Sequence, residues 1–110
     1  MNQRIAILSD IHGDTTALKA VIADARALGA TEYWLLGDIL LPGPGREDLF
    51  ELLDAIPITA AVRGNWDDCV LEALDGEYGL EDPQEVQLLR LTQYVMEGID
   101  PKRIDWLRSL

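Results

Sequence analysis

The sequence predicts an α/β fold built on a three-stranded parallel sheet. Three short apolar runs occupy residues 5–8, 33–36 and 58–62. The segments between these runs carry apolar residues at helical spacing, so strand and helix alternate along the chain. Strands joined through helices pair in parallel, with right-handed crossovers. Each apolar run is nearly continuous, which is typical of a sheet covered on both faces.

The first predicted helix follows the strand at residues 5–8. Asp14 or Thr15 can cap its start through a side-chain oxygen, and Gly29 ends it. Apolar residues recur on one face of this segment: Leu18, Val21, Ile22, Ala25 and Leu28. The second strand, residues 32–36, follows after a short connection, so these elements form one crossover unit.

A loop in which proline and glycine alternate, residues 40–45, follows the second strand. Such a loop excludes regular structure, and we expect it to form one wall of a site beside Asp38. Residues 46–55 predict the second helix, and Pro57 introduces the third strand. The rest of the chain predicts further helices over residues 68–74, 84–96 and 102–110, with no fourth strand. We find no internal repeat or linker and predict a single domain over residues 1–110.

Composition and charge narrow the functional classes. The chain has 20 acidic and nine basic residues and a net charge of -11. Without a basic stripe, binding to a nucleic acid polymer is not expected. A single cysteine, Cys69, favours a reducing compartment. The first apolar run is too short for a signal peptide or a membrane span, so the sequence predicts a cytoplasmic protein without a membrane partner.

Side chains of metal-ligand type follow all three predicted strands. Asp10 and His12 follow the first strand, Asp38 the second and Asn65 the third. Side chains two apart in an extended segment point the same way, so we expect Asp10 and His12 to converge. The carboxyl ends of parallel strands are where an open α/β sheet binds its ligands. The four side chains therefore predict a metal site at this edge.

Asp38 is the predicted bridge of that site. A carboxylate has two oxygens and can hold two divalent cations about 3.5 to 4 Å apart. Asp10 and His12 would be the further ligands of one ion, and the amide oxygen of Asn65 would bind the other. Mixed nitrogen and oxygen ligands suit manganese, iron or zinc better than calcium. Two such ions would clamp a phosphate and lower the pKa of a shared water that attacks phosphorus.

Three residues close to Asn65 in the sequence each have two possible roles. Arg63 either binds a substrate phosphate through its planar guanidinium or makes surface contacts. Asp67 is either a site residue or, like Asp68, a cap of the following helix. Trp66 either packs in the interior or faces substrate.

The segments Asp10-Ile11-His12, Gly37-Asp38 and Gly64-Asn65-Trp66-Asp67 resemble the motifs of the calcineurin-like metallophosphoesterases. Their order and spacing are those of the family, and the chain is most similar to its small bacterial phosphoesterases. The resemblance implies hydrolysis of a phosphate monoester or diester, with a phosphorylated small molecule or nucleotide as substrate. It implies two divalent metal ions, manganese first, with iron, zinc or magnesium as alternatives. It assigns Asp10, His12, Asp38 and Asn65 to the metals, with Asp38 and Asn65 also catalytic.

Two departures from the family pattern shape the expected fold. Trp66 stands where many members have a histidine that protonates the leaving group, and His12 is the only histidine, although the family has further ones after this region. We therefore expect the N-terminal half of an α/β/β/α sandwich, a βαβαβ unit followed by C-terminal helices, without the second sheet. Apolar sheet surface would then be exposed, which predicts a homo-oligomer or a missing C-terminal half.

Two other functions fit the same sequence. One is a truncated, non-catalytic module that binds a cation or a partner. The other is a phosphoacceptor domain of the signalling-receiver type, which shares the alternating strands and acidic strand ends but does not need His12 or Asn65.

Overall fold

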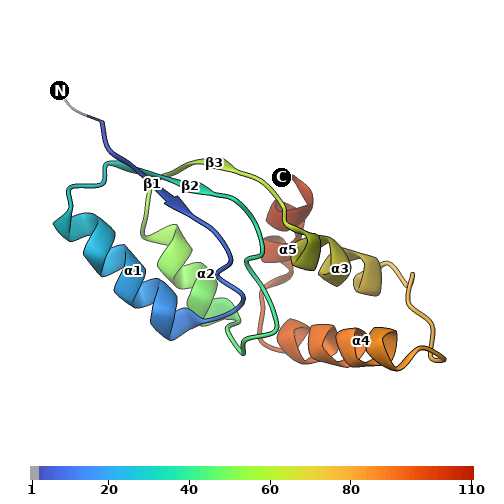
Figure 1. Cartoon of the computed structure of the whole chain (residues 1–110). Coiled ribbons are helices and arrows are strands. Elements are labelled where there is room, and N and C mark those ends of the chain that lie inside the picture. Colours follow the sequence, from blue (N-terminus) through green and yellow to red (C-terminus); the bar gives the residue numbers. More distant parts are fainter. Residues whose placement is uncertain (1–2) are drawn as a thin grey trace.

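The computed structural model describes residues 3–110, which form the α/β arrangement that the sequence predicts (Figure 1). The elements in chain order are β1 Ile5–Leu8, α1 Thr15–Ala27, β2 Glu32–Leu35, α2 Glu47–Asp54, β3 Ile58–Ala61, α3 Asn65–Leu74, α4 Pro83–Met96 and α5 Pro101–Arg108. Every predicted element is present, and most ends agree within one or two residues. The main difference is α3, which begins at Asn65 and not at Asp68.

The three strands form one parallel sheet in the order β1-β2-β3. Ile7 of β1 is paired with Trp34 of β2, and Trp34 is paired with Ala60 of β3. A register shift follows Tyr33, beside Thr59 on the neighbouring strand. The parallel sheet confirms the predicted fold class, and it brings the carboxyl ends of all three strands to one edge.

One face of the sheet is covered by α1 and α2, which lie side by side below it in Figure 1. Their apolar faces and the inward-facing residues of β2 form the core, with side chains that are at most 4% exposed: Leu18, Ile22, Tyr33, Leu35, Leu49, Phe50 and Leu53. Of the two caps that the sequence allows, Asp14 caps α1 by accepting a hydrogen bond from the amide of Ala17 at 2.9 Å, and Thr15 is the first residue of the helix. The core thus fixes the sheet on one side only.

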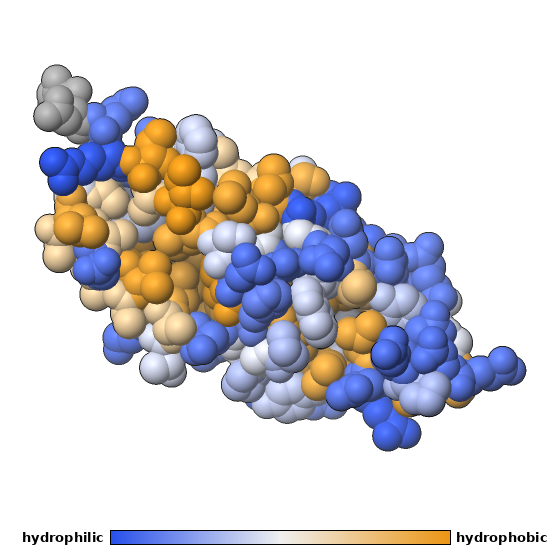
Figure 2. Space-filling model, in the orientation of Figure 1, coloured by the Kyte–Doolittle hydropathy of each residue, from blue (hydrophilic) through white to orange (hydrophobic). Residues whose placement is uncertain are grey.

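The opposite face of the sheet is open among the described residues. Ile7 is 56% exposed, Leu36 50% and Val62 52%. Figure 2 shows hydrophobic side chains gathered over the strands. The expectation of cover on both faces is therefore wrong, because the helices of this chain pack on one side. The outward-facing apolar residues instead give the exposed surface expected when a second sheet is absent.

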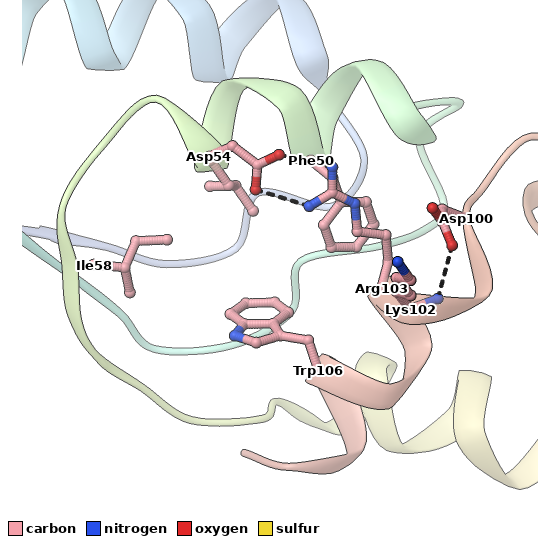
Figure 3. A pocket seen from close by; sticks show the side chains of 8 residues that line it. Phe50, Asp54, Ile58, Asp100, Lys102, Arg103 and Trp106 are labelled. Atoms are coloured by element: carbon pink, nitrogen blue, oxygen red, sulfur yellow. Dashed lines mark hydrogen bonds and ion pairs between the residues drawn. The ribbon is translucent and has the colours of Figure 1, made fainter.

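The C-terminal helices form a second layer beside the sheet, in which α3 packs against α4 and α5. Arg103 of α5 ties this layer to α2 through Glu47 at 2.8 Å and Asp54 at 2.7 Å. A pocket of about 380 Å³ lies between α5 and α2, with Phe50 and Trp106 in its wall (Figure 3). None of the predicted metal ligands lines this pocket. Within residues 3–110, every helix is too short or too polar to cross a lipid bilayer.

Candidate metal centre

The candidate metal centre lies where the loops after β1 and β2 run side by side. The amide of Asp10 donates to the carbonyl of Gly37 at 3.2 Å, and the amide of His12 donates to the carbonyl of Asp38 at 2.8 Å. The amide of Gly13 continues the series to Ile39 at 2.8 Å. These backbone hydrogen bonds extend the parallel pairing past the strand ends and place the first two predicted ligands beside the third.

Asp10, His12 and Asp38 form a cluster of potential ligands. Each offers one ligand atom, and these atoms all lie within 4.8 Å of one another. Within it, Nε2 of His12 is 3.2 Å from Oδ1 of Asp10. Asp10 is exposed, and His12 and Asp38 are half-buried, so the cluster faces solvent on one side. Two carboxylates and one imidazole within this distance form a donor set suited to a divalent transition metal.

All three members of the cluster have left-handed backbone conformations. Their φ angles are 57° at Asp10, 51° at His12 and 57° at Asp38. Such conformations cost about 1–3 kcal/mol each in non-glycine residues and are concentrated at functional sites. From the sequence we expect Asp10 and His12 to converge because side chains alternate along an extended strand. This reason is wrong, because β1 ends at Leu8, before both residues. They converge because the loop turns at both residues.

The imidazole of His12 is oriented by the loop over residues 40–45. Its Nδ1 is 2.8 Å from the carbonyl oxygen of Leu41. A carbonyl only accepts hydrogen bonds, so Nδ1 carries the hydrogen, and Nε2 is the ring nitrogen that faces Asp10; without a proton, Nε2 would present its lone pair to that carboxylate. Two acceptors 3.2 Å apart require a proton or a cation between them. A backbone carbonyl behind a histidine is also the usual outer contact of a metal ligand, so these residues fit a divalent ion.

Asp10 is suited to bind a cation. The hydroxyl of Ser9, which donates to Oδ2 of Asp10 at 2.8 Å, lowers the pKa of that carboxyl. His12 lowers it further by hydrogen bonding and by its charge when protonated. Asp10 is therefore ionised at neutral pH, as a metal ligand must be.

The turn between β3 and α3 lies against Asp38. The amide of Trp66 donates to Oδ1 of Asp38 at 2.9 Å, and the Trp66 ring meets the His12 ring edge-on with centroids 5.9 Å apart. Asn65 is the first residue of α3, between Gly64 and Trp66, both of which contact Asp38. The backbone of Asn65 is thus placed beside the cluster, and its role as a ligand stays a prediction.

Arg63 and Asp67 occupy different surroundings. The Nε of Arg63 is 3.2 Å from Asp68, and one terminal nitrogen donates to the carbonyl of Arg108. This guanidinium therefore makes contacts within the protein, and its role toward substrate stays a prediction.

Asp67, whose role the sequence left open, is completely buried. Sequence spacing gave no sign of that burial, because it depends on contacts with a loop almost thirty residues away.

The fold and the cluster together define an α/β protein with a candidate divalent-metal site at the carboxyl edge of a parallel sheet. Comparison with known families then gives the particular class: a calcineurin-like phosphoesterase superfamily domain matches residues 3–108. The chain belongs to this superfamily. This membership confirms the resemblance that the motifs indicate and excludes the receiver-type alternative.

Individual proteins that are similar to this chain include a bacterial and an archaeal one. A metallophosphoesterase from Sphaerobacter thermophilus, known from its crystal structure, matches all of the chain with a TM-score of 0.69 and 31% identity. An uncharacterised protein of Methanocaldococcus jannaschii is 38% identical over 79 residues, which cover 68% of this chain. The matches span 42% of the first protein and 32% of the second. This chain thus corresponds to less than half the length of either.

Proposed function

We propose that the protein is a metal-dependent phosphoesterase that hydrolyses a phosphate monoester or diester. The observation that supports this most strongly is the cluster of Asp10, His12 and Asp38 within 4.8 Å, in a chain that belongs to the calcineurin-like phosphoesterases. The sequence motifs name these three residues but do not show that their side chains lie close together; the structure does. Their convergence at the carboxyl edge of the sheet supports a working centre.

The residues of the cluster would divide the work of binding two divalent ions. Asp10 and His12 would hold the first ion, because the Nε2 lone pair and the Asp10 carboxylate face each other. Asp38 would bridge, with Oδ1 oriented by the Trp66 amide, and Asn65 would serve the second ion. Such ions supply Lewis acidity and a bound water of lowered pKa. Asp38 and Asn65 are the proposed catalytic residues on this basis.

The proposed substrate is a phosphorylated small molecule or a nucleotide. A chain with a net charge of -11 repels anionic substrates unless local cations offset its field. Metal ions at the cluster would supply that positive charge, and Arg63 is a further candidate at the same edge. Manganese is the proposed metal, with iron, zinc or magnesium as alternatives for the same ligands. A cytoplasmic location and a homo-oligomer or longer chain that covers the open sheet face stay predictions.

A second candidate function is a non-catalytic module that binds one cation or a partner. The observation that favours it is the open face of the sheet, where apolar residues such as Ile7 and Val62 lie exposed. Trp66 also occupies the position at which many members of the family have a histidine that protonates the leaving group. A protein of this kind would bind manganese without turnover.

Hydrolysis of p-nitrophenyl phosphate and its bis ester, with and without manganese, distinguishes the two functions. The phosphoesterase should release p-nitrophenol only with metal, and Asp38→Asn should remove at least about 99% of that activity. Asp82→Asn is the matched control, because Asp82 is an exposed cap of α4 that accepts from the Gln84 amide, a role that asparagine retains. Manganese binding without turnover would support a cation-binding module, and turnover that does not depend on metal would refute the proposed phosphoesterase.

A further inference from the structure

Asp67 is the one charged side chain that is buried among the described residues, with 0% exposure. Its two oxygens accept hydrogen bonds from four backbone amides. Oδ2 accepts from Asp38 at 2.8 Å and Gly64 at 3.0 Å, and Oδ1 accepts from Ile39 at 2.9 Å and more weakly from Leu40 at 3.4 Å. A buried carboxylate is costly unless it is fully hydrogen-bonded, and these amides satisfy both of its oxygens.

Helix capping does not account for this arrangement. Asp67 lies in the first turn of α3, where capping requires only the bond from Gly64 and where negative charge is favoured by the helix dipole. The other three amides belong to the loop after β2. Successive amides that point to one anion form a concave anion site, which here is filled by a side chain of the protein itself.

The side chain of Asp38 in turn accepts a hydrogen bond from the turn that carries Asp67. Its Oδ1 accepts the Trp66 amide at 2.9 Å, while its own amide donates to Asp67 at 2.8 Å. Each aspartate therefore binds the backbone next to the other, and the two loops are locked in one relative position. The lock holds Asp38 at a φ of 57°, a conformation that a free loop would rarely adopt.

We infer that Asp67 is a positioning residue of the metal centre: it fixes the loop over residues 38–40 so that the Asp38 carboxylate faces Asp10 and His12 before any ion binds. The inference rests on the proposed function, since it assumes that the cluster binds a divalent ion. Asp67 itself touches neither the ion nor the substrate. Outer contacts of this kind typically change metal affinity by about 10–100-fold when they are removed.

The test is Asp67→Asn, measured by calorimetric titration of the purified protein with manganese. Asparagine has the same shape, but its amide group would turn donors toward two of the backbone amides and leave them unpaired. We expect the manganese Kd to rise about 10–100-fold in protein whose circular dichroism shows it folded. Asp82→Asn, the same chemical change at an exposed cap, should bind manganese as the wild type does. A folded Asp67→Asn protein with an unchanged Kd would overturn the inference.

A second measurement applies even if Asp67→Asn does not fold. In the metal-free wild-type protein, amide hydrogen exchange at Asp38 and Ile39 should be as slow as in β2, because Asp67 holds these amides in advance. Exchange at the rate of an exposed loop would refute positioning. The two proposals fail separately: wild-type protein that binds no manganese removes the proposed function, whereas equal binding by wild type and Asp67→Asn removes only the role of Asp67.

Discussion

Gly64→Ala tests whether the spacing between the two loops sets the position of Asp38. A Cβ at Gly64 would lie 2.6 Å from Cγ of Asp38 and closer still to its Oδ1, whereas ordinary contact begins at 3.4 Å. The carboxylate would have to move by at least about 0.8 Å, the difference between these distances at Cγ. Functional geometry tolerates displacements of about 0.5 Å, and a 1 Å error can cost about 100-fold in rate. We therefore expect the manganese Kd to rise at least about tenfold and turnover to fall about 100-fold.

Calorimetry with manganese and p-nitrophenol release measure the two effects of Gly64→Ala. Overpacking should also lower the free energy of unfolding by about 1–3 kcal/mol, which urea denaturation would report. Gly79→Ala is the control, because a Cβ there meets only Glu85 at 3.8 Å. If folded Gly64→Ala protein bound manganese as tightly as the wild type, the contact between these loops would not determine the site.

Three further predictions concern stability. Arg103→Ala removes the ion pairs to Glu47 and Asp54, and because these carboxylates are partly exposed we expect a loss of about 1 kcal/mol in the free energy of unfolding by urea. The Arg103 guanidinium holds the pKa of Glu47 below its ordinary 4.5 and that of Asp54 below 3.8. Carboxyls with lowered folded-state pKa values stabilise the fold above their unfolded values and lose this effect as pH falls. The stabilities of wild type and Arg103→Ala should therefore converge as pH falls below the ordinary values of 4.5 and 3.8. A difference that stays constant with pH would contradict this cause. Ile7→Thr should change stability by less than about 0.5 kcal/mol, because Ile7 lies on the open face, whereas Leu35→Ala should cost about 2–5 kcal/mol in the core; a large cost at Ile7 would show that the face is covered in solution.

The fold could be predicted closely because its signals are local. Apolar runs, helical spacing and the proline and glycine positions place every strand and helix among residues 3–110. Cover of the sheet could not be read in this way. An apolar run indicates that both faces of a strand are apolar, but it does not show which helix, sheet or second chain packs on each face. Ile7 and Leu36 lie exposed among the described residues.

The candidate site was predicted by residue type but not by geometry. Asp10, His12 and Asp38 meet as expected, yet through left-handed loop residues and not through an extended strand. A φ angle depends on contacts with a neighbouring loop, and spacing within one segment does not contain that information. The same limit hid Asp67, because its four donors become visible only when the loops after β2 and β3 are placed side by side.

Metal binding and catalysis need not depend on the same parts of this protein. The cluster is held by backbone pairing between the first two loops, by the Leu41 carbonyl behind His12 and by the contacts of Asp38 with α3, all within the described residues. None of these contacts involves the open face of the sheet. The proposed hydrolysis also needs a group that protonates the leaving group. Trp66 stands at the position where many members of the family have a histidine for this step. Ion affinity should therefore survive substitutions on the open face, whereas the proposed turnover also needs a proton donor that the contacts of this cluster do not supply.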